Sequence, residues 1–265
     1  MSEANTVIPL REHQEPAARE PRRFKVFTAR QLDKIEQLQR LAEEARFAMR
    51  VVANVLPFRV NEYVIEELID WDQVPNDPIY QLTFPQKGML APEHFDKVAE
   101  AMRGGDKAEI KATIAEVREA LNPHPAGQME HNMPEVDGEK IDGVQHKYNE
   151  TVLFFPSQGQ VCHSYCTFCF RWAQFIGDND LKIATKEAGQ LKKYIQAHPE
   201  ISDVLITGGD PLVMKTKNLR AHIEPLLELE QIRTIRIGSK ALTFWPQRVV
   251  SDADAQHLQN LSEEL

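Results

Sequence analysis

The sequence predicts an α/β protein in which a helical amino-terminal region precedes a sheet of parallel strands. Between residues 24 and 121 apolar residues recur at three- and four-residue spacing, which indicates helices. After residue 148 short β-rich apolar runs alternate with helical stretches, the pattern of βαβ units with right-handed crossovers. Between these parts, residues 122–147 are rich in Pro and Gly and predict a linker or wrapping loop.

The amino-terminal part divides into a tail and a helical region. Residues 1–23 are polar and without period, so we expect a flexible, solvated tail rather than a binding arm. From Thr28 the pattern is helical until Pro57 stops it. The following spacing predicts helices over 61–69, 92–102 and 106–121, with an irregular segment over 71–92. Asp106 with Glu109 resembles a capping box at the start of the last of these helices.

The carboxyl-terminal part, residues 148–265, contains three runs that predict strands, at 151–155, 203–207 and 232–237. Helical stretches follow over 185–197 and 218–229, the second with an expected kink at Pro225. A last helix begins near Ser251. Parallel strands are buried on both faces, so we expect apolar side chains on both sides of this sheet.

Composition excludes several classes of protein. The 265 residues include 31 Lys and Arg against 40 Asp and Glu, for a formal net charge of −9. An acidic balance argues against a general nucleic-acid binder or a protein that binds anionic membranes. No stretch approaches the length of a membrane-spanning helix, and the first residues lack the apolar core of a secretory signal. We therefore expect a cytoplasmic protein with neither a nucleic-acid nor a membrane partner.

The cysteines are the most informative residues. The chain has three, Cys162, Cys166 and Cys169, all within eight residues after the first predicted strand. An odd number without an export signal argues against disulfides. Thiolates on one loop suit a soft metal centre, and an iron–sulfur cluster is favoured, with one iron left open to a small molecule. Two alternatives remain: three unrelated thiols, or a zinc site. The fourth zinc ligand would come from one of these histidines: His124, His131 or His146.

Longer motifs around these residues resemble a known family. The Cys-x-x-x-Cys-x-x-Cys spacing is similar to the signature of radical S-adenosylmethionine (SAM) enzymes. CTFCFRW surrounds the last two cysteines, LITGGDPL (205–212) follows the second strand, and RIGSKALTFWPQR (236–248) follows the third. Together with the His-Lys-Tyr triplet at 146–148, these motifs resemble the lysine 2,3-aminomutase family. The resemblance covers about 148–265 and continues more weakly into YQLTFPQKGML (80–90).

The resemblance implies a role for each matching residue. The three cysteines would ligate a [4Fe–4S] cluster whose open iron binds the amino and carboxylate groups of SAM. Gly208, Gly209 and Asp210 match the segment that receives the methionine end of SAM. Two glycines also allow close approach of the backbone to a ligand, and a carboxylate accepts from an ammonium. Arg171 matches the arginine that holds the substrate α-carboxylate, a task that suits a guanidinium.

The resemblance also implies a site for pyridoxal phosphate (PLP). Lys147 and Tyr148 match a segment that helps to hold its phosphate, although Thr151 stands where a second arginine is expected. Lys240 is not expected to be the PLP lysine, which lies far downstream in the family. A radical SAM partial barrel has about six βα units and only three strands are predicted here. We therefore expect 148–265 to be the first half of such a barrel, in a chain truncated at its carboxyl end.

The expected parent activity is an aminomutase that converts L-lysine or a similar amino acid to its β-isomer. Its cofactors would be the cluster, SAM and PLP, and its electron donor a protein such as flavodoxin or ferredoxin. A homo-oligomer is a further expectation. The alternatives are another radical SAM enzyme, acting on a protein lysine or without PLP, and a non-catalytic metal-binding fragment.

Overall fold

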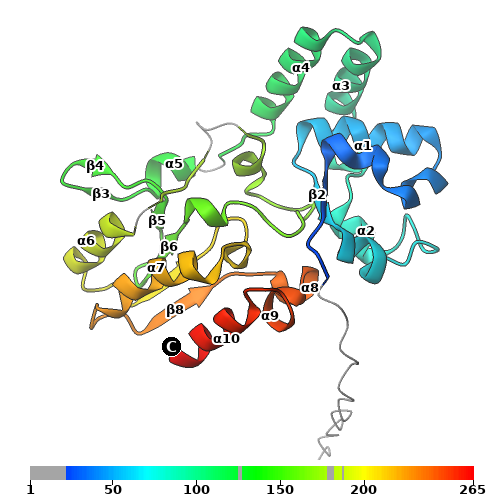
Figure 1. Ribbon diagram of the computed structural model, residues 1–265. Coiled ribbons are helices and arrows are strands. Elements are labelled where there is room, and N and C mark those ends of the chain that lie inside the picture. Colours follow the sequence, from blue (N-terminus) through cyan, green and yellow to red (C-terminus); the bar gives the residue numbers. More distant parts are fainter. Residues whose placement is uncertain (1–21, 125–126, 178–181, 187) are drawn as a thin grey trace, which may run out of the picture.

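The computed structural model describes residues 22–124, 127–177, 182–186 and 188–265, and its two halves lie side by side (Figure 1). The first half is mainly helical, and the second contains a four-stranded sheet. The main helices of the first half are α1 (Glu43–Val55), α2 (Pro78–Thr83), α3 (Pro92–Gly104) and α4 (Lys107–Ala120). A two-stranded ribbon pairs β1 (Val26–Thr28) antiparallel with β2 (Arg59–Asn61).

The long first helix predicted from Thr28 is wrong over its first half. Two 3₁₀ helices, Ala29–Lys34 and Glu36–Arg40, stand there, separated by an extended residue at Ile35. The physical reason lies in the spacing, because the apolar residues at 32, 35, 38 and 41 recur every three residues. A 3₁₀ helix has three residues per turn, so this strict period places all of them on one face. Three of the four are buried: Leu32, Ile35 and Leu38.

The later helices follow the sequence pattern more closely. The Asp106 carboxylate accepts a hydrogen bond from the Glu109 N–H at 2.8 Å and caps α4, as the motif predicts. The helix predicted over 61–69 is shorter, a π-helical turn over Val64–Leu68 that follows β2. The segment predicted to be irregular contains α2, whose first helical residue, Pro78, follows the capping carboxylate of Asp77.

The sheet of the second half has the order β5-β6-β7-β8. Its strands are β5 (Val144–His146), β6 (Thr151–Phe154), β7 (Asp203–Ile206) and β8 (Thr234–Ile237). The three predicted strands are all present and pair in parallel, with Val152 opposite Val204 and Val204 opposite Ile235. The connecting helices are α6 (Gly189–Ala197) and α7 (Thr216–Leu227), and α8 (Ala241–Phe244), α9 (Gln247–Val250) and α10 (Ala255–Glu264) follow β8.

The segment expected to be a linker carries regular structure. It includes α5 (Gln128–His131), the β3 (Glu135–Val136) and β4 (Glu139–Lys140) hairpin, and strand β5. Strand β5 pairs antiparallel with β6, so the sheet is mixed rather than wholly parallel. The short run Val144–His146 has no alternating pattern long enough to predict a strand, and its pairing comes from the neighbouring β6.

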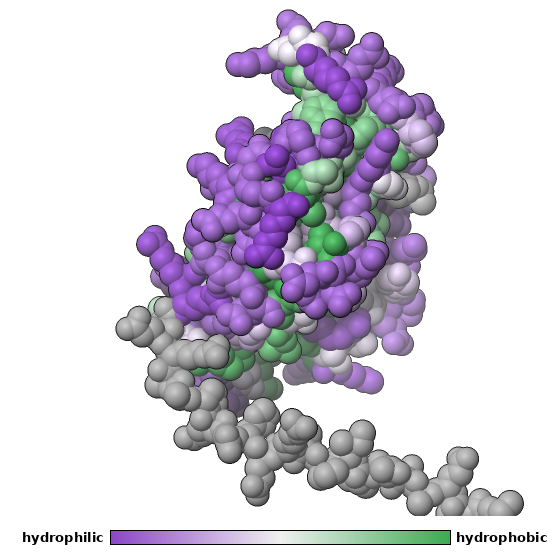
Figure 2. Space-filling model, turned by 90° about the vertical axis from the view of Figure 1, so that its right-hand side faces the viewer, coloured by the Kyte–Doolittle hydropathy of each residue, from purple (hydrophilic) through white to green (hydrophobic). Residues whose placement is uncertain are grey.

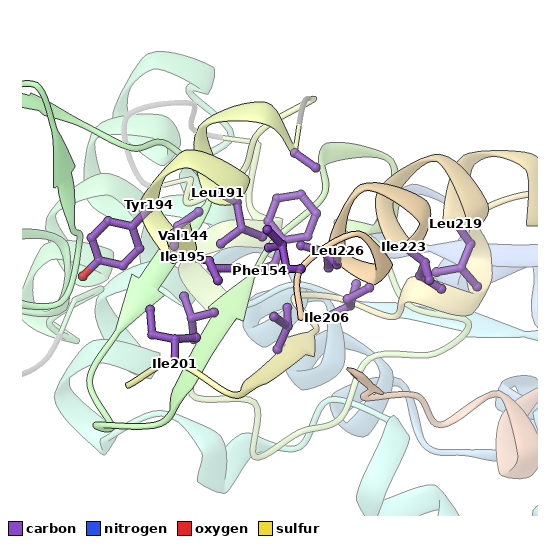
Figure 3. Close-up of a cluster of buried hydrophobic side chains, with 14 of the residues drawn as sticks. Val144, Phe154, Leu191, Tyr194, Ile195, Ile201, Ile206, Leu219, Ile223 and Leu226 are labelled. Atoms are coloured by element: carbon purple, nitrogen blue, oxygen red, sulfur yellow. The ribbon is translucent and has the colours of Figure 1, made fainter. Parts of the chain in front are cut away.

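Within the described residues, helices cover one face of this sheet. On that face Val152, Phe154, Val204 and Ile206 are inaccessible to solvent and belong to one core with residues of α6, α7 and α10. Figure 3 shows Phe154 and Ile206 among apolar side chains of α6 and α7. Alternate residues on the other face are half-buried or exposed. There the Asp203 carboxylate accepts hydrogen bonds from Thr151 Oγ1 at 2.7 Å and Arg236 Nε at 2.9 Å. The expectation that both faces are apolar is therefore met only in part within the described residues, because the second face carries Leu153 and Leu205 beside this polar group.

The two halves share part of their cores. Phe244, from α8, packs among the buried residues of the first half, which include Phe58, Tyr80 and Phe84. Figure 2 views the molecule from the side of the amino-terminal helices, where hydrophilic side chains dominate and a narrow hydrophobic strip runs between them. No helix within the described ranges has both the length and the apolar character needed to cross a bilayer.

A buried arginine fixes the end of the chain to the sheet region. Arg248, with 5% of its side chain exposed, donates to the carbonyl oxygens of Leu212 at 2.8 Å and Met214 at 3.0 Å and to Asp254 Oδ2 at 2.9 Å. Partial burial opposes ionisation of Asp254. Hydrogen bonds from the Thr216 N–H and hydroxyl, with the charge of Arg248, outweigh that effect and hold the pKa of Asp254 below its usual value.

The variant Asp254→Asn is expected to lower the free energy of unfolding at pH 7 by about 3 kcal/mol, because it leaves a buried guanidinium without its counter-charge. Because the folded-state pKa lies below the unfolded one, Asp254 stabilises the protein above about pH 4 and this contribution disappears as the pH falls through the folded pKa. Urea unfolding between pH 3 and 7 measures both effects. The exposed Asp142→Asn is the control, and an equal loss in both variants would contradict the assignment.

Candidate functional site

A cavity of about 390 Å³ lies at the carboxyl ends of the three parallel strands. The loop after β6, residues 155–171, contains all three cysteines, and we call it the cysteine loop. It meets residues 207–210 after β7 and residues 238–240 after β8. Carboxyl ends of parallel strands share one edge of a sheet, so motifs far apart in sequence converge there. The lining residues are Cys162, Ser164, Tyr165, Cys166, Phe168, Cys169, Phe170, Arg171, Thr207, Gly208, Gly209, Asp210, Gly238, Ser239 and Lys240.

The cysteines are free, half-buried thiols. Burial raises the pKa of Cys162, and the negative charges of Asp210, Cys169 and Cys166 raise it further. Burial likewise raises the pKa of Cys169. Thiols in this setting stay protonated at neutral pH, and a bound metal is what makes the thiolates stable.

The described residues offer no ligand set for a single metal ion. Among the residues that the structure describes, no three His, Cys, Asp or Glu side chains are grouped as ligands of one ion. Each thiolate of an iron–sulfur cube binds a different iron, so its sulfur atoms stand farther apart than ligands of one ion. None of the three histidines considered as a fourth zinc ligand lines the cavity. The zinc alternative therefore has no support from this geometry.

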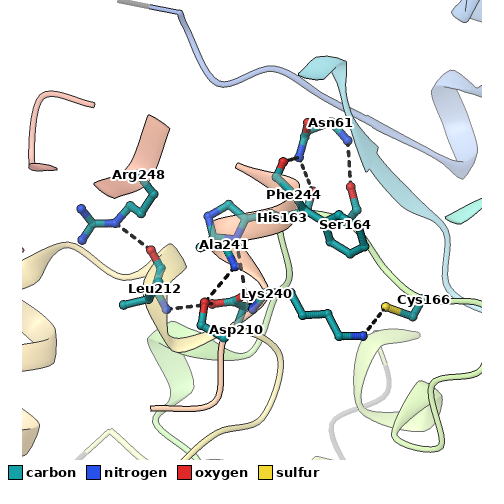
Figure 4. Close-up of polar contacts among 11 residues, drawn as sticks. Asn61, His163, Ser164, Cys166, Asp210, Leu212, Lys240, Ala241, Phe244 and Arg248 are labelled. Atoms are coloured by element: carbon teal, nitrogen blue, oxygen red, sulfur yellow. Dashed lines mark hydrogen bonds and ion pairs between the residues drawn. The ribbon is translucent and has the colours of Figure 1, made fainter. Parts of the chain in front are cut away.

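The amino-terminal half holds the cysteine loop by backbone hydrogen bonds. The Tyr165 N–H donates to the carbonyl oxygen of Arg59 at 2.8 Å, and the Thr167 N–H donates to that of Leu82 at 2.8 Å. Asn61 is inaccessible to solvent, and its side-chain amide donates to the carbonyl oxygens of Phe244 at 2.8 Å and His163 at 3.3 Å (Figure 4). Strand β2 thus positions both the cysteine loop and the segment after β8.

The two glycines after β7 pack against the cysteine loop. Gly208 has φ of +131°, a region that side chains rarely adopt. A Cβ added at Gly208 would lie 2.1 Å from Gln160 Nε2, and one added at Gly209 would lie 2.5 Å from the backbone nitrogen of Val161. The next N–H, of Asp210, donates to the carbonyl oxygen of Val161 at 2.8 Å. The glycines are therefore required first for contact between two loops of this chain.

Asp210 joins all three loops of the site. Only 2% of the residue is exposed. Its Oδ1 accepts from Ser239 Oγ at 2.7 Å, its Oδ2 accepts from the Lys240 N–H at 2.8 Å, and His163 Nδ1 stands 3.5 Å from Oδ2 (Figure 4). Burial opposes ionisation, but the interactions with His163, Ser239 and Lys240 hold the pKa of Asp210 below its usual value. Because both oxygens already accept from this chain, direct contact of Asp210 with an ammonium stays a prediction.

Two cations face the cavity. Lys240 Nζ lies 2.8 Å from Cys166 Sγ and 4.8 Å from the centre of the Phe168 ring. The guanidinium of Arg171 lies 4.6 Å from the Phe155 ring centre and 5.2 Å from that of Phe170. Among the described residues no carboxylate pairs with Arg171, so its charge is available to an anionic group of a ligand.

Comparisons with known proteins identify relatives of this chain. A putative L-lysine 2,3-aminomutase of Aquifex aeolicus is 33% identical over 215 residues, which cover 81% of this chain and 47% of that protein. L-lysine 2,3-aminomutases of Acetoanaerobium sticklandii and Bacillus subtilis are 31% and 24% identical over 134 and 222 residues, 50% and 84% of this chain. The chain belongs to the lysine 2,3-aminomutase family. It spans 47%, 32% and 39% of the lengths of these three relatives. No protein-family model matches it.

The family resemblance also pointed to Lys147 and Tyr148, which the structure does not bring to the cavity. Both are exposed, with Lys147 Nζ 6.0 Å from the centre of the Tyr148 ring. They precede β6, whereas the cysteine loop follows it, so the length of the strand separates the two groups. Their role in PLP binding stays a prediction.

Several residues of the site were not predicted. Ser239 and Lys240 lie in the family motif at 236–248, but no role at the cavity was predicted for them; their position after β8, at the carboxyl end of a strand, could have supplied one. Asn61 has no such signal, since it lies about a hundred residues from the cysteines and its local sequence indicates only a helix start.

The variant Gly209→Ala is expected to displace the cysteine loop, because its methyl group would meet the Val161 backbone rather than a flexible side chain. We expect a loss of about 1–3 kcal/mol in the free energy of unfolding, typical of overpacking. Chemical denaturation measures it. Gly189→Ala, with no atom within 4 Å of its added Cβ, is the matched control and should be neutral or stabilising. Equal behaviour of the two variants would refute the packing role.

Proposed function

We propose that this protein is a radical SAM aminomutase that acts on L-lysine or a similar amino acid. One observation supports this most: three cysteines, Arg171 and the Gly208–Gly209 turn, each expected from the family motifs, line a single cavity. The family similarity supplies the reaction class, an isomerisation.

The cysteine loop would hold a [4Fe–4S] cluster through Cys162, Cys166 and Cys169. When bound, the cluster and SAM would supply a 5′-deoxyadenosyl radical, and PLP would carry the migrating nitrogen. The chain's own contribution is position and shielding. Hydrogen bonds to β2 and to the segment after α2 fix the loop, and Lys240 places a positive charge beside the Cys166 sulfur. Hydrogen bonds to ligand sulfurs raise the potential of such clusters, which makes reduction easier.

Arg171 would bind the α-carboxylate of the substrate. Its guanidinium is half-buried against two aromatic rings, and burial together with this packing restricts its orientation. Burial lowers the pKa of Arg171, while the neighbouring Cys169 raises it, and the side chain remains a cation. A carboxylate held there lies at the same cavity as the three thiols, which is the proximity that hydrogen abstraction requires.

The three parallel strands would form part of a radical SAM partial barrel, with the open face of the sheet lining its interior. This face already carries the polar group of Thr151, Asp203 and Arg236. A protein electron donor such as flavodoxin or ferredoxin would supply the reducing electron.

A radical SAM enzyme that does not use PLP is the second candidate. It is favoured by the position of Lys147 and Tyr148, which line no part of the cavity. Borohydride reduction of the full-length enzyme with PLP separates the two candidates. Recovery of one phosphopyridoxyl-lysine favours the aminomutase, and its absence at saturating PLP favours the second candidate.

Replacing Cys162, Cys166 or Cys169 by Ser is expected to abolish an oxygen-sensitive cluster, because two thiolates cannot anchor a cube. Anaerobic reconstitution, iron and sulfide analysis and the visible absorbance measure this loss. Ser157→Ala, on the same loop but outside the cavity lining, should keep a full complement of iron. Stoichiometric iron and sulfide in a variant lacking all three cysteines would refute the proposal.

Replacing Arg171 by Gln is expected to lower kcat/KM for L-lysine at least about ten-fold in the full-length enzyme, since it removes a charge-assisted hydrogen-bonding partner. Arg171→Lys should lower kcat/KM by a smaller factor, because an ammonium keeps the charge but does not reproduce the bidentate contact. The iron content should not change. L-Lysinamide, which lacks the carboxylate charge, is the control substrate. The Arg171 variants should affect it little, and an equal loss would place the role of Arg171 elsewhere.

A further inference from the structure

A second cavity, of about 360 Å³, lies between the amino-terminal helices and the cysteine loop. It borders the first cavity at Tyr165, which lines both. Its walls combine apolar and aromatic side chains with arginines, and none of the described residues that line it is aspartate or glutamate. The lining residues are Thr28, Ala29, Arg30, Ala53, Leu56, Pro57, Phe58, Arg59, Arg118, Tyr165, Phe175 and Ile176.

Arg59 is the decisive residue of this cavity. Its side chain is half-buried, and its Nε is inaccessible to solvent and has no hydrogen-bond partner. Among the described residues no carboxylate lies within ion-pair distance of Arg59. Its guanidinium is 6.0 Å from the centre of the Phe24 ring, a contact that attracts a cation without neutralising it.

Within the described part of the chain, none of the residues that line this cavity carries a carboxylate that could neutralise Arg59. A cation removed from water without a counter-charge is costly, and a bound anion would offset that cost.

The other charged side chains of the cavity are also arginines, and its aromatic side chains form a wall that suits a flat apolar group. Arg30 is exposed and, among the described residues, has no ion pair. Arg118 is held at the cavity by hydrogen bonds to the carbonyl oxygens of Val55 at 2.8 Å and Asn54 at 2.9 Å. Arg59 and Arg30 thus stand at this cavity without an ion pair among the described residues, in a chain whose net charge is −9. Tyr165 stacks on Phe175, with ring centres 4.9 Å apart, and provides a flat apolar wall.

We propose that this cavity is a binding site for a small organic anion, a carboxylate or phosphate monoester. Its charged end would pair with Arg59 and Arg30, and its apolar body would pack on Tyr165 and Phe175. The volume lies in the range of small-molecule sites, and few polar groups among apolar walls are their usual composition. Because Tyr165 belongs to the cysteine loop, the ligand would contact the back of the loop that carries the thiols. The site does not depend on the proposed reaction.

The test uses the full-length protein and isothermal titration calorimetry with two probes, benzoate and phenyl phosphate, which separate the carboxylate and phosphate sources. Benzyl alcohol, the uncharged analogue, and inorganic phosphate, which lacks the apolar body, are the controls. We expect one of the charged aromatic probes to bind one-to-one, with weaker binding at high salt. Both controls should bind at least ten-fold more weakly.

Variants locate the site. Arg59→Gln is expected to weaken probe binding about ten-fold or more, and Arg30→Gln, an exposed substitution that leaves the fold intact, several-fold. Arg233→Gln removes the same charge from an exposed position outside the cavity and should leave binding unchanged. Circular dichroism verifies that each variant is folded. If Arg59→Gln is unfolded, the effect of Arg30→Gln on probe binding decides whether the probe binds at this cavity.

Three outcomes would overturn the proposal. The first is the absence of saturable binding of either probe at millimolar concentration. The second is equal weakening by Arg30→Gln and Arg233→Gln, which indicates a general effect of charge. The third is unchanged probe binding in a folded Arg59→Gln that loses iron, because the charge of Arg59 would then serve the cysteine loop instead.

Discussion

The site depends on one constraint, the fixation of the cysteine loop by backbone hydrogen bonds to distant segments. The loop has little regular structure of its own, a single 3₁₀ turn over Ser157–Gly159. Within the loop, the Cys169 N–H also donates to the Cys166 carbonyl oxygen at 3.1 Å, and further hydrogen bonds come from other segments. The carbonyl oxygens of Arg59 and Leu82 hold one side, and the Asp210 N–H, which donates to Gly159 and Val161, holds the other. A loop held at backbone atoms tolerates changes in its side chains, which leaves the thiols free to serve as ligands.

Charge is distributed so that this loop can accept metal ligation. The three thiols are half-buried, and burial together with neighbouring negative charges raises the pKa of Cys162 and of Cys169, which disfavours their thiolates in the absence of a metal. Asp210 is the carboxylate that lines the cavity among the described residues, and both of its oxygens accept hydrogen bonds from this chain. The cations Lys240 and Arg171 therefore dominate the open part of the cavity. A site of this kind favours an anionic occupant, whether a cluster with thiolate ligands or the carboxylate of an amino acid.

Much of the second half could be predicted from sequence because its signals are local. Strands β6, β7 and β8 are short apolar runs, and their parallel order follows from the intervening helices. The convergence of the cysteines with Gly208 and Arg171 follows from that order. The first half was predicted less well. The strict three-residue spacing of its leucines and isoleucine matches a 3₁₀ helix, a distinction that a general helical pattern conceals. The contacts of Asn61 depend on tertiary structure alone.

The two faces of the sheet show why the local sequence of a strand does not predict how deeply each of its residues is buried. Val152 and Leu153 are adjacent apolar residues of β6, yet the first is inaccessible and the second is half-buried. The difference arises because, within the described residues, helices cover one face of the sheet. Successive side chains of a strand point to opposite faces, so Leu153 points to the face without helices. On that face Asp203 accepts hydrogen bonds from neighbouring strands on either side. A cross-strand polar group of this kind satisfies its own hydrogen bonds, so it can face water or a ligand without an apolar cover. The open face thus combines the polar group of Thr151, Asp203 and Arg236 with the apolar side chains of Leu153 and Leu205, which lie nearer the carboxyl ends of the strands.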